Sequence, residues 1–140
     1  MATAPKSEVL KLAELVAYQD GSVVSRQITK ADAGNVTLFA FDKDQELSEH
    51  TAPFDALVHI LDGEAEVKIS SKPYQLGTGD AIIMPADEPH AVRAVQRFKM
   101  LLTMLFRSGA EWMCSSTMPA WRCSFRSKND HWKMFAVSLK

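Results

Sequence analysis

Long apolar runs and an excess of either charge are both missing from this sequence. The 16 lysines and arginines nearly balance the 17 aspartates and glutamates, so the formal net charge is -1. This balance provides no general attraction to nucleic acid or to an anionic membrane. The longest apolar stretch, at 100–106, is interrupted by Thr103 and is too short to cross a bilayer. We therefore expect neither a nucleic-acid partner nor a membrane partner.

Cysteine is too scarce for a disulfide framework. The only two cysteines, Cys114 and Cys123, lie near the C-terminus, and a single pair is weak support for an oxidising compartment. The first residues also lack the basic segment and apolar run of a secretory signal. These absences predict a cytoplasmic protein. The content of 46% hydrophobic and 24% charged residues in a chain of 140 is typical of one globular domain.

The segment 1–20 predicts a short N-terminal helix. Ser7 is a suitable N-cap, and Gly21 can end the helix. Between them, apolar residues recur at helical spacing: Val9, Leu12, Ala13 and Val16.

From Gly21 onward the pattern changes to short strands separated by turns. Apolar and charged residues alternate over 64–69, which predicts a strand with one face in water. The dipeptide Asp62-Gly63 predicts a hairpin turn between this strand and the run 56–61. Further strands and turns are indicated at 23–28, 36–41, 70–73, 77–80, 81–84 and 98–106. Many short strands with a single helix predict an all-β sandwich or barrel over 21–107.

The C-terminal segment 108–140 has a different composition. It contains all three tryptophans and both cysteines, and it has no sustained helical or strand period. It could be an extension packed on the barrel, a partner-binding segment or a segment without settled structure. Cys114, Cys123 and His131 match no zinc-finger or zinc-ribbon spacing.

Two stretches of the chain resemble the motifs of the cupin superfamily. Gly79, Pro85 and His90 follow one another as in the second cupin motif, while His50 and Gly63 stand where the first motif has its first histidine and its turn glycine. The resemblance covers roughly 21–107 and looks like the small single-domain bacterial cupins of the "cupin 2 conserved barrel" type. It implies a cupin (double-stranded β-helix, or jelly-roll) barrel with a central pocket.

The metal site that this resemblance implies is incomplete here. The family uses three histidines and a carboxylate, but Ala52 replaces the second histidine and Ala56 replaces the glutamate. His50 and His90 remain as candidate ligands for one divalent transition metal. Alternation along the strand would turn the neighbouring Asp55 to the face opposite Ala56.

The two alanines would leave the barrel interior roomier and more apolar. Such a pocket suits a small, partly apolar ligand held by one or two histidines. By the same strand alternation His59 faces outward. The predicted ligand pocket consists of His50, Ala52, Ala56, Val58, Ile60, Met84, His90 and Met104.

Three functions are open at this point, and no catalytic residue can be assigned. The first is a module that binds a small-molecule ligand without turnover. The second is a metal-dependent cupin enzyme, such as an isomerase or an oxygenase. The third is a structural platform with a vestigial pocket. The resemblance also favours a homodimer formed through edge strands, for which 23–28 could provide the edge.

Overall fold

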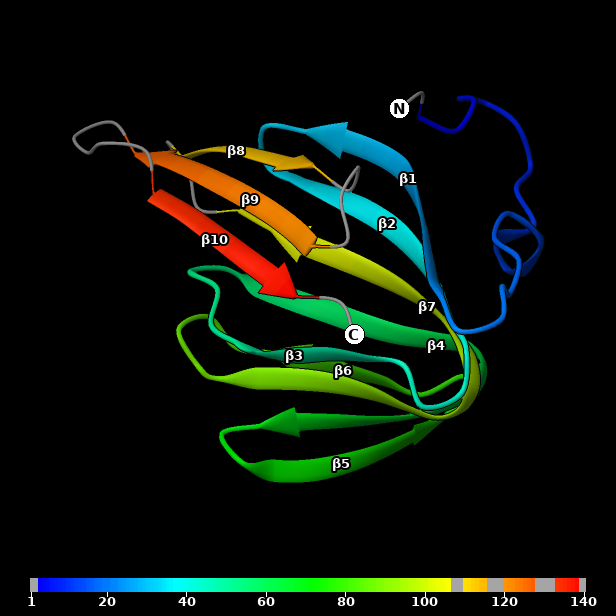
Figure 1. Cartoon of the computed structure of the whole chain (residues 1–140). Helices are drawn as coiled ribbons and strands as arrows, with labels where there is room; N and C mark the ends of the chain where they lie inside the picture. The colour runs from blue at the N-terminus through cyan, green and yellow to red at the C-terminus, as the bar shows by residue number, and fades with distance from the viewer. Residues whose placement is uncertain (1–2, 107–109, 116–119, 128–132, 139–140) are drawn as a thin grey trace.

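The computed structural model describes residues 3–106, 110–115, 120–127 and 133–138. These residues form one 3-10 turn and ten strands (Figure 1). In chain order the elements are η1 (Leu12–Glu14), β1 (Val23–Ala31), β2 (Gly34–Phe41), β3 (Glu46–His50), β4 (Asp55–Ile69), β5 (Lys72–Gly77), β6 (Ala81–Met84), β7 (His90–Leu105), β8 (Ala110–Ser115), β9 (Ala120–Ser127) and β10 (Lys133–Ser138). The architecture is all-β, as the spacing of strands and turns predicted.

The first seven strands make one antiparallel sheet. Its order is β1-β2-β7-β4-β5, with β3 also paired to β7 and β6 also paired to β4. The long strands β4 and β7 therefore pair with each other and with strands on both halves of the curved sheet (Figure 1). The strand at 23–28 predicted as an edge is β1, which lies at one end of this order.

The segment 108–140 contributes a second, three-stranded antiparallel sheet in the order β10-β9-β8. Strand β10 lies near β3 (Figure 1). His131 lies outside the described residues. Among those residues, no helix is both long enough and apolar enough to cross a membrane.

The N-terminal helix predicted over 1–20 is wrong, because the described part of this segment contains only the turn η1. Ser7 has a φ of 60° rather than the extended backbone of an N-cap, and Val9 is 97% exposed. The segment instead lies across the outer face of the sheet, where Ala4 and Val16 are buried. The burial of these side chains outweighs the weak preference of a short isolated segment for helix.

Polar contacts hold this N-terminal segment in place. The amide of Ala4 donates to the carbonyl of Ile28 at 2.8 Å, on strand β1. The Nζ of Lys99 donates to the carbonyl of Ala13 at 2.5 Å. The Tyr18 hydroxyl donates to the carboxylate of Asp62 at 2.5 Å. Together these bonds pin the segment to β1, β4 and β7.

The hairpin predicted at Asp62-Gly63 is also wrong, because β4 runs straight through this dipeptide. Gly63 has a φ of 82°, and the register between β4 and β7 shifts on both sides of it. A Cβ at this position would lie 1.8 Å from the carbonyl oxygen of Arg97. Gly63 therefore allows a bulged, close approach of two paired strands, and the chain does not reverse there.

The turns predicted at 70–73 and 77–80 are confirmed. Ile69 pairs with Lys72 across the β4–β5 hairpin, and the two residues between them, Ser70 and Ser71, have φ values of 49° and 68°. Positive φ at both central residues is what a tight two-residue hairpin turn requires. In the second turn the amide of Asp80 donates to the carbonyl of Gly77 at 3.0 Å.

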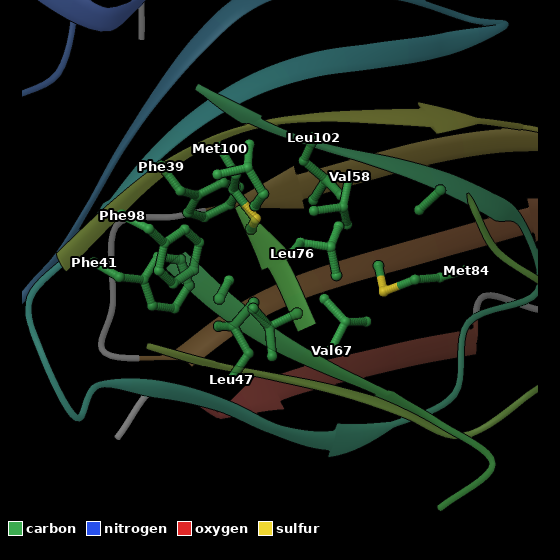
Figure 2. Packing of buried hydrophobic residues seen from close by; sticks show 14 of the residues in the cluster. Phe39, Phe41, Leu47, Val58, Val67, Leu76, Met84, Phe98, Met100 and Leu102 are labelled. Atoms are coloured by element: carbon green, nitrogen blue, oxygen red, sulfur yellow. The ribbon is translucent and has the colours of Figure 1, made fainter. Parts of the chain in front are cut away.

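The interior of the main sheet holds the larger apolar core. Phe39, Phe41 and Phe98 gather at one end of it, with the rings of Phe41 and Phe98 stacked at 4.5 Å between centroids (Figure 2). On β4, Ala56, Val58 and Ile60 are all buried in this core, as strand alternation predicted. The same alternation leaves His59 on the other face, where it is half-buried.

Candidate functional site

Two histidines forty positions apart in the sequence meet where β3 ends and β7 begins. His50 and His90 are direct partners in the antiparallel register of these strands. Their ring centroids lie 4.3 Å apart, with the ring planes at 73° to each other. His90 is 3% exposed, and His50 is half-buried. The strand pairing therefore creates a compact pair of imidazoles shielded from most solvent.

Each ring is held by a backbone carbonyl two residues before it. The Nδ1 of His50 lies 2.8 Å from the carbonyl oxygen of Ser48, and the Nδ1 of His90 lies 3.1 Å from that of Glu88. A carbonyl oxygen can only accept, so each Nδ1 must carry the proton and donate it. In a neutral imidazole this leaves the Nε2 atom with a lone pair. Each of the two adjacent rings thus keeps one hydrogen-bond acceptor, its Nε2.

Both imidazoles are held in the neutral form. Burial lowers the pKa of His50 below its ordinary value, against the opposing effect of the Ser48 carbonyl. Burial, together with the adjacent His50, lowers the pKa of His90 to about 4, because two charged rings would repel each other. At neutral pH the pair therefore carries no charge.

The pair lines an apolar cavity inside the sheet. Six of the eight residues predicted for the pocket line it: His50, Ala52, Ala56, Met84, His90 and Met104. Val58 and Ile60 do not, because both are fully buried in the packed core. The remaining lining residues, which the sequence analysis did not name, are Phe39, Leu47, Thr51, Phe54, Val92, Met100 and Leu102.

A row of three residues forms one wall of the cavity. Ala56 on β4 pairs in register with Met84 on β6 and with Met104 on β7. The methyl side chain of Ala56 lies between the two flexible thioethers and leaves space beside them. Figure 2 shows Met84 away from the cluster of Phe39, Phe41 and Phe98, which fills the other end of the core.

The segments flanking the histidines are tied to each other by hydrogen bonds that backbone amides donate. The amide of Asp87 donates to the carbonyl of Ala52 at 2.8 Å. The amide of Ala86 donates to the Oδ1 of Asp55 at 2.8 Å. The Asp55 carboxylate is thus engaged by the backbone and is not among the cavity-lining residues, as strand alternation predicted. These bonds fix the loop that leads into His90.

The donor set that the described residues provide does not fit a resident transition metal. Among the described residues, no three or more histidine, cysteine, aspartate or glutamate side chains are grouped so as to hold a metal ion. Two imidazoles fall short of the three protein ligands of catalytic zinc sites and of the two-histidine, one-carboxylate set of non-haem iron sites. We therefore derive no chemistry through a metal bound by His50 and His90.

Comparisons with known proteins support a common fold. Residues 37–106 match the family model described as the Cupin domain. A conserved protein of unknown function from Streptococcus pyogenes is 35% identical, over 77% of this chain and 97% of that chain, with a TM-score of 0.71. A cupin superfamily protein from Desulfitobacterium hafniense is 30% identical, over 76% of this chain and 97% of that chain, with a TM-score of 0.70. The comparison with curated proteins gives no match.

A third solved structure is similar to this chain over only part of its own, longer chain. The cupin 2 conserved barrel domain protein from Leptotrichia buccalis is 39% identical, over 69% of this chain and 47% of that chain, with a TM-score of 0.67. None of these three names states a ligand or a reaction.

Proposed function

The chain belongs to the cupin domain family, and from this premise we propose that it is a binding module that holds a small molecule beside His50 and His90. The pair of neutral imidazoles at the wall of an apolar cavity is the observation that carries this proposal. Ligand pockets of this kind combine an apolar lining with a few well-placed polar groups.

The Nε2 atoms of His50 and His90 support the proposal of a bound ligand. Among the described residues, the bonds assigned to the two rings engage Nδ1 and leave Nε2 of each without a protein partner. A buried acceptor without a donor costs about 1–3 kcal/mol. A ligand that donates a hydrogen bond to one Nε2 removes part of that cost. The binding free energy of a polar ligand is therefore more favourable here than it would be in a wholly apolar cavity.

The two alternative functions have less support. A metal-dependent isomerase or oxygenase needs more protein ligands than His50 and His90 provide. A structural platform with a vestigial pocket gives no role to two imidazoles aligned on one cavity. A homodimer through β1 is compatible with the binding function, since β1 lies at the end of the sheet; light scattering on the purified protein measures its mass directly.

Methionine methyl groups provide a direct test of binding. Three of the seven methionines line the cavity, namely Met84, Met100 and Met104. With methyl-labelled methionine, we expect NMR titration with a panel of one-ring neutral, anionic and cationic compounds to yield at least one that shifts these three signals together. The replacements His50→Ala and His90→Ala should each lower the affinity for that compound at least tenfold, because a hydrogen bond to the imidazole is lost.

His59→Ala serves as the matched control. His59 is a half-buried histidine on β4 that does not line the cavity, so its loss should leave the affinity within about twofold, as changes away from a site usually do. The proposal fails if no panel compound moves the three methyl signals, or if both cavity-histidine variants bind as tightly as the His59→Ala protein.

A further inference from the structure

Among the residues whose side chains the structure describes, the cavity lining contains no charged group that could offset a charged ligand. None of its thirteen residues is aspartate, glutamate, lysine or arginine. Its side-chain polar groups are the two imidazoles and the hydroxyl of Thr51, which lies exposed at one side. Moving a charged group from water into such surroundings is costly unless a partner neutralises it. The lining therefore favours a neutral ligand.

The imidazoles also dictate the polarity of the hydrogen bond. Because the carbonyls of Ser48 and Glu88 take both Nδ1 protons, each Nε2 can accept and cannot donate. A ligand group that only accepts, such as an ether or ester oxygen, would leave both Nε2 atoms without a donor. A hydroxyl group supplies the missing donor.

The rest of the lining suits an aromatic body. Phe39 and Phe54 lie among the lining residues together with Met84, Met100 and Met104. Thioether sulfurs make favourable contacts with aromatic rings, and methionine adjusts its shape readily. The cavity volume is about 50 Å³, several times the roughly 10–15 Å³ that one water needs. This space is compatible with a ligand of about one ring.

We propose that the cavity binds a small neutral phenol, whose hydroxyl donates to the Nε2 of His50 or His90 and whose ring packs against the methionines. This inference rests on the proposed binding function and narrows it to one class of ligand. It requires no metal, and the protein changes no covalent bond of the ligand.

Three probe compounds of similar size separate the effects of the ring, the hydrogen-bond donor and the charge on binding. Phenol offers a ring and a donor, anisole offers the ring with an acceptor only, and benzoate offers the ring with a negative charge. We expect phenol to shift the methyl signals of Met84, Met100 and Met104 at pH 7. Anisole should bind at least tenfold more weakly because it leaves both Nε2 atoms unpaired. Benzoate should bind at least a hundredfold more weakly because its charge has no partner among the described lining residues.

The outcomes distinguish this inference from the function on which it rests. Anisole or benzoate binding as tightly as phenol at the same three methionines would overturn the phenol assignment and leave a small-molecule site in place. No shift with any of the three probes would overturn the assignment as well, and the wider panel then decides whether the cavity binds anything. The His59→Ala protein should retain the full preference for phenol over anisole.

Discussion

Replacing Gly63 with alanine is expected to lower the free energy of unfolding by at least about 3 kcal/mol. Two costs combine at this position. The φ of 82° is one that residues with a Cβ rarely adopt, and the added methyl would lie 1.8 Å from the carbonyl oxygen of Arg97. That oxygen belongs to the backbone of β7, so the clash can be relieved only by separating two long paired strands. Urea unfolding of the variant measures the loss.

Gly21→Ala is the matched control for this change. Gly21 also has a positive φ, of 65°, but a Cβ there would meet no atom within 4 Å. Its replacement should cost only the conformational penalty of about 1 kcal/mol. Equal losses in the two variants would mean that the close approach of β4 and β7 at Gly63 does not constrain the fold.

Acidification from pH 6.5 to pH 4 is expected to remove about 3 kcal/mol of stability. Burial lowers the pKa of His90 to about 4, whereas an unfolded histidine titrates near 6.5. Between these values the unfolded chain binds a proton that the folded protein excludes. The stabilisation is therefore fully present above pH 6.5 and is lost progressively as the pH falls to 4. His50, whose pKa is also lowered by burial, adds a loss of the same sign.

Urea unfolding at pH 7 and at pH 4 measures this effect, and His90→Gln identifies its source. The variant cannot take up the proton, so its stability should change much less over the same interval. Asp42 does not interfere in this range, because the amide of Gly21 and the side chain of Arg97 hold its pKa at about 2. The ionised Asp42 carboxylate stabilises the folded protein at higher pH. This stabilisation is lost only when the pH falls from the ordinary pKa of 3.8 towards 2. An unchanged pH dependence in His90→Gln would show that His90 is not the titrating group.

The sequence was sufficient to predict the barrel and the meeting of its histidines. The cupin barrel inferred from the motifs is confirmed by the family match and by the structural relatives. Alternation along β4 correctly placed Ala56 in the interior and Asp55 outside it. This success has a simple physical origin, because side-chain direction in a strand repeats every two residues and survives moderate bending.

The errors came from contacts between residues distant in the chain. The backbone of Arg97 determines that Gly63 forms a bulge, and no local pattern around Asp62-Gly63 shows that contact. Likewise, the segment 1–20 has helical spacing, yet its apolar side chains pack on the outer face of the sheet in an irregular conformation. Burial against another part of the chain outweighed local preference in both cases.

The sequence also could not predict which interior residues of β4 line the cavity. Val58 and Ile60 share a face with Ala56, but both are fully buried in the packed apolar core and do not reach the cavity. Some missed lining residues could have been found. Extending the alternation along β7 from His90 to Met104 includes Val92, Met100 and Leu102.

Nitrogen NMR of the two imidazoles tests the central claim most directly. At pH 7, the spectra should show both rings neutral, with the proton on Nδ1 and an unprotonated Nε2. Addition of phenol should shift at least one Nε2 signal in the direction of a newly accepted hydrogen bond. Protons found on Nε2 of both rings, or Nε2 signals that do not respond to saturating phenol, would contradict the account.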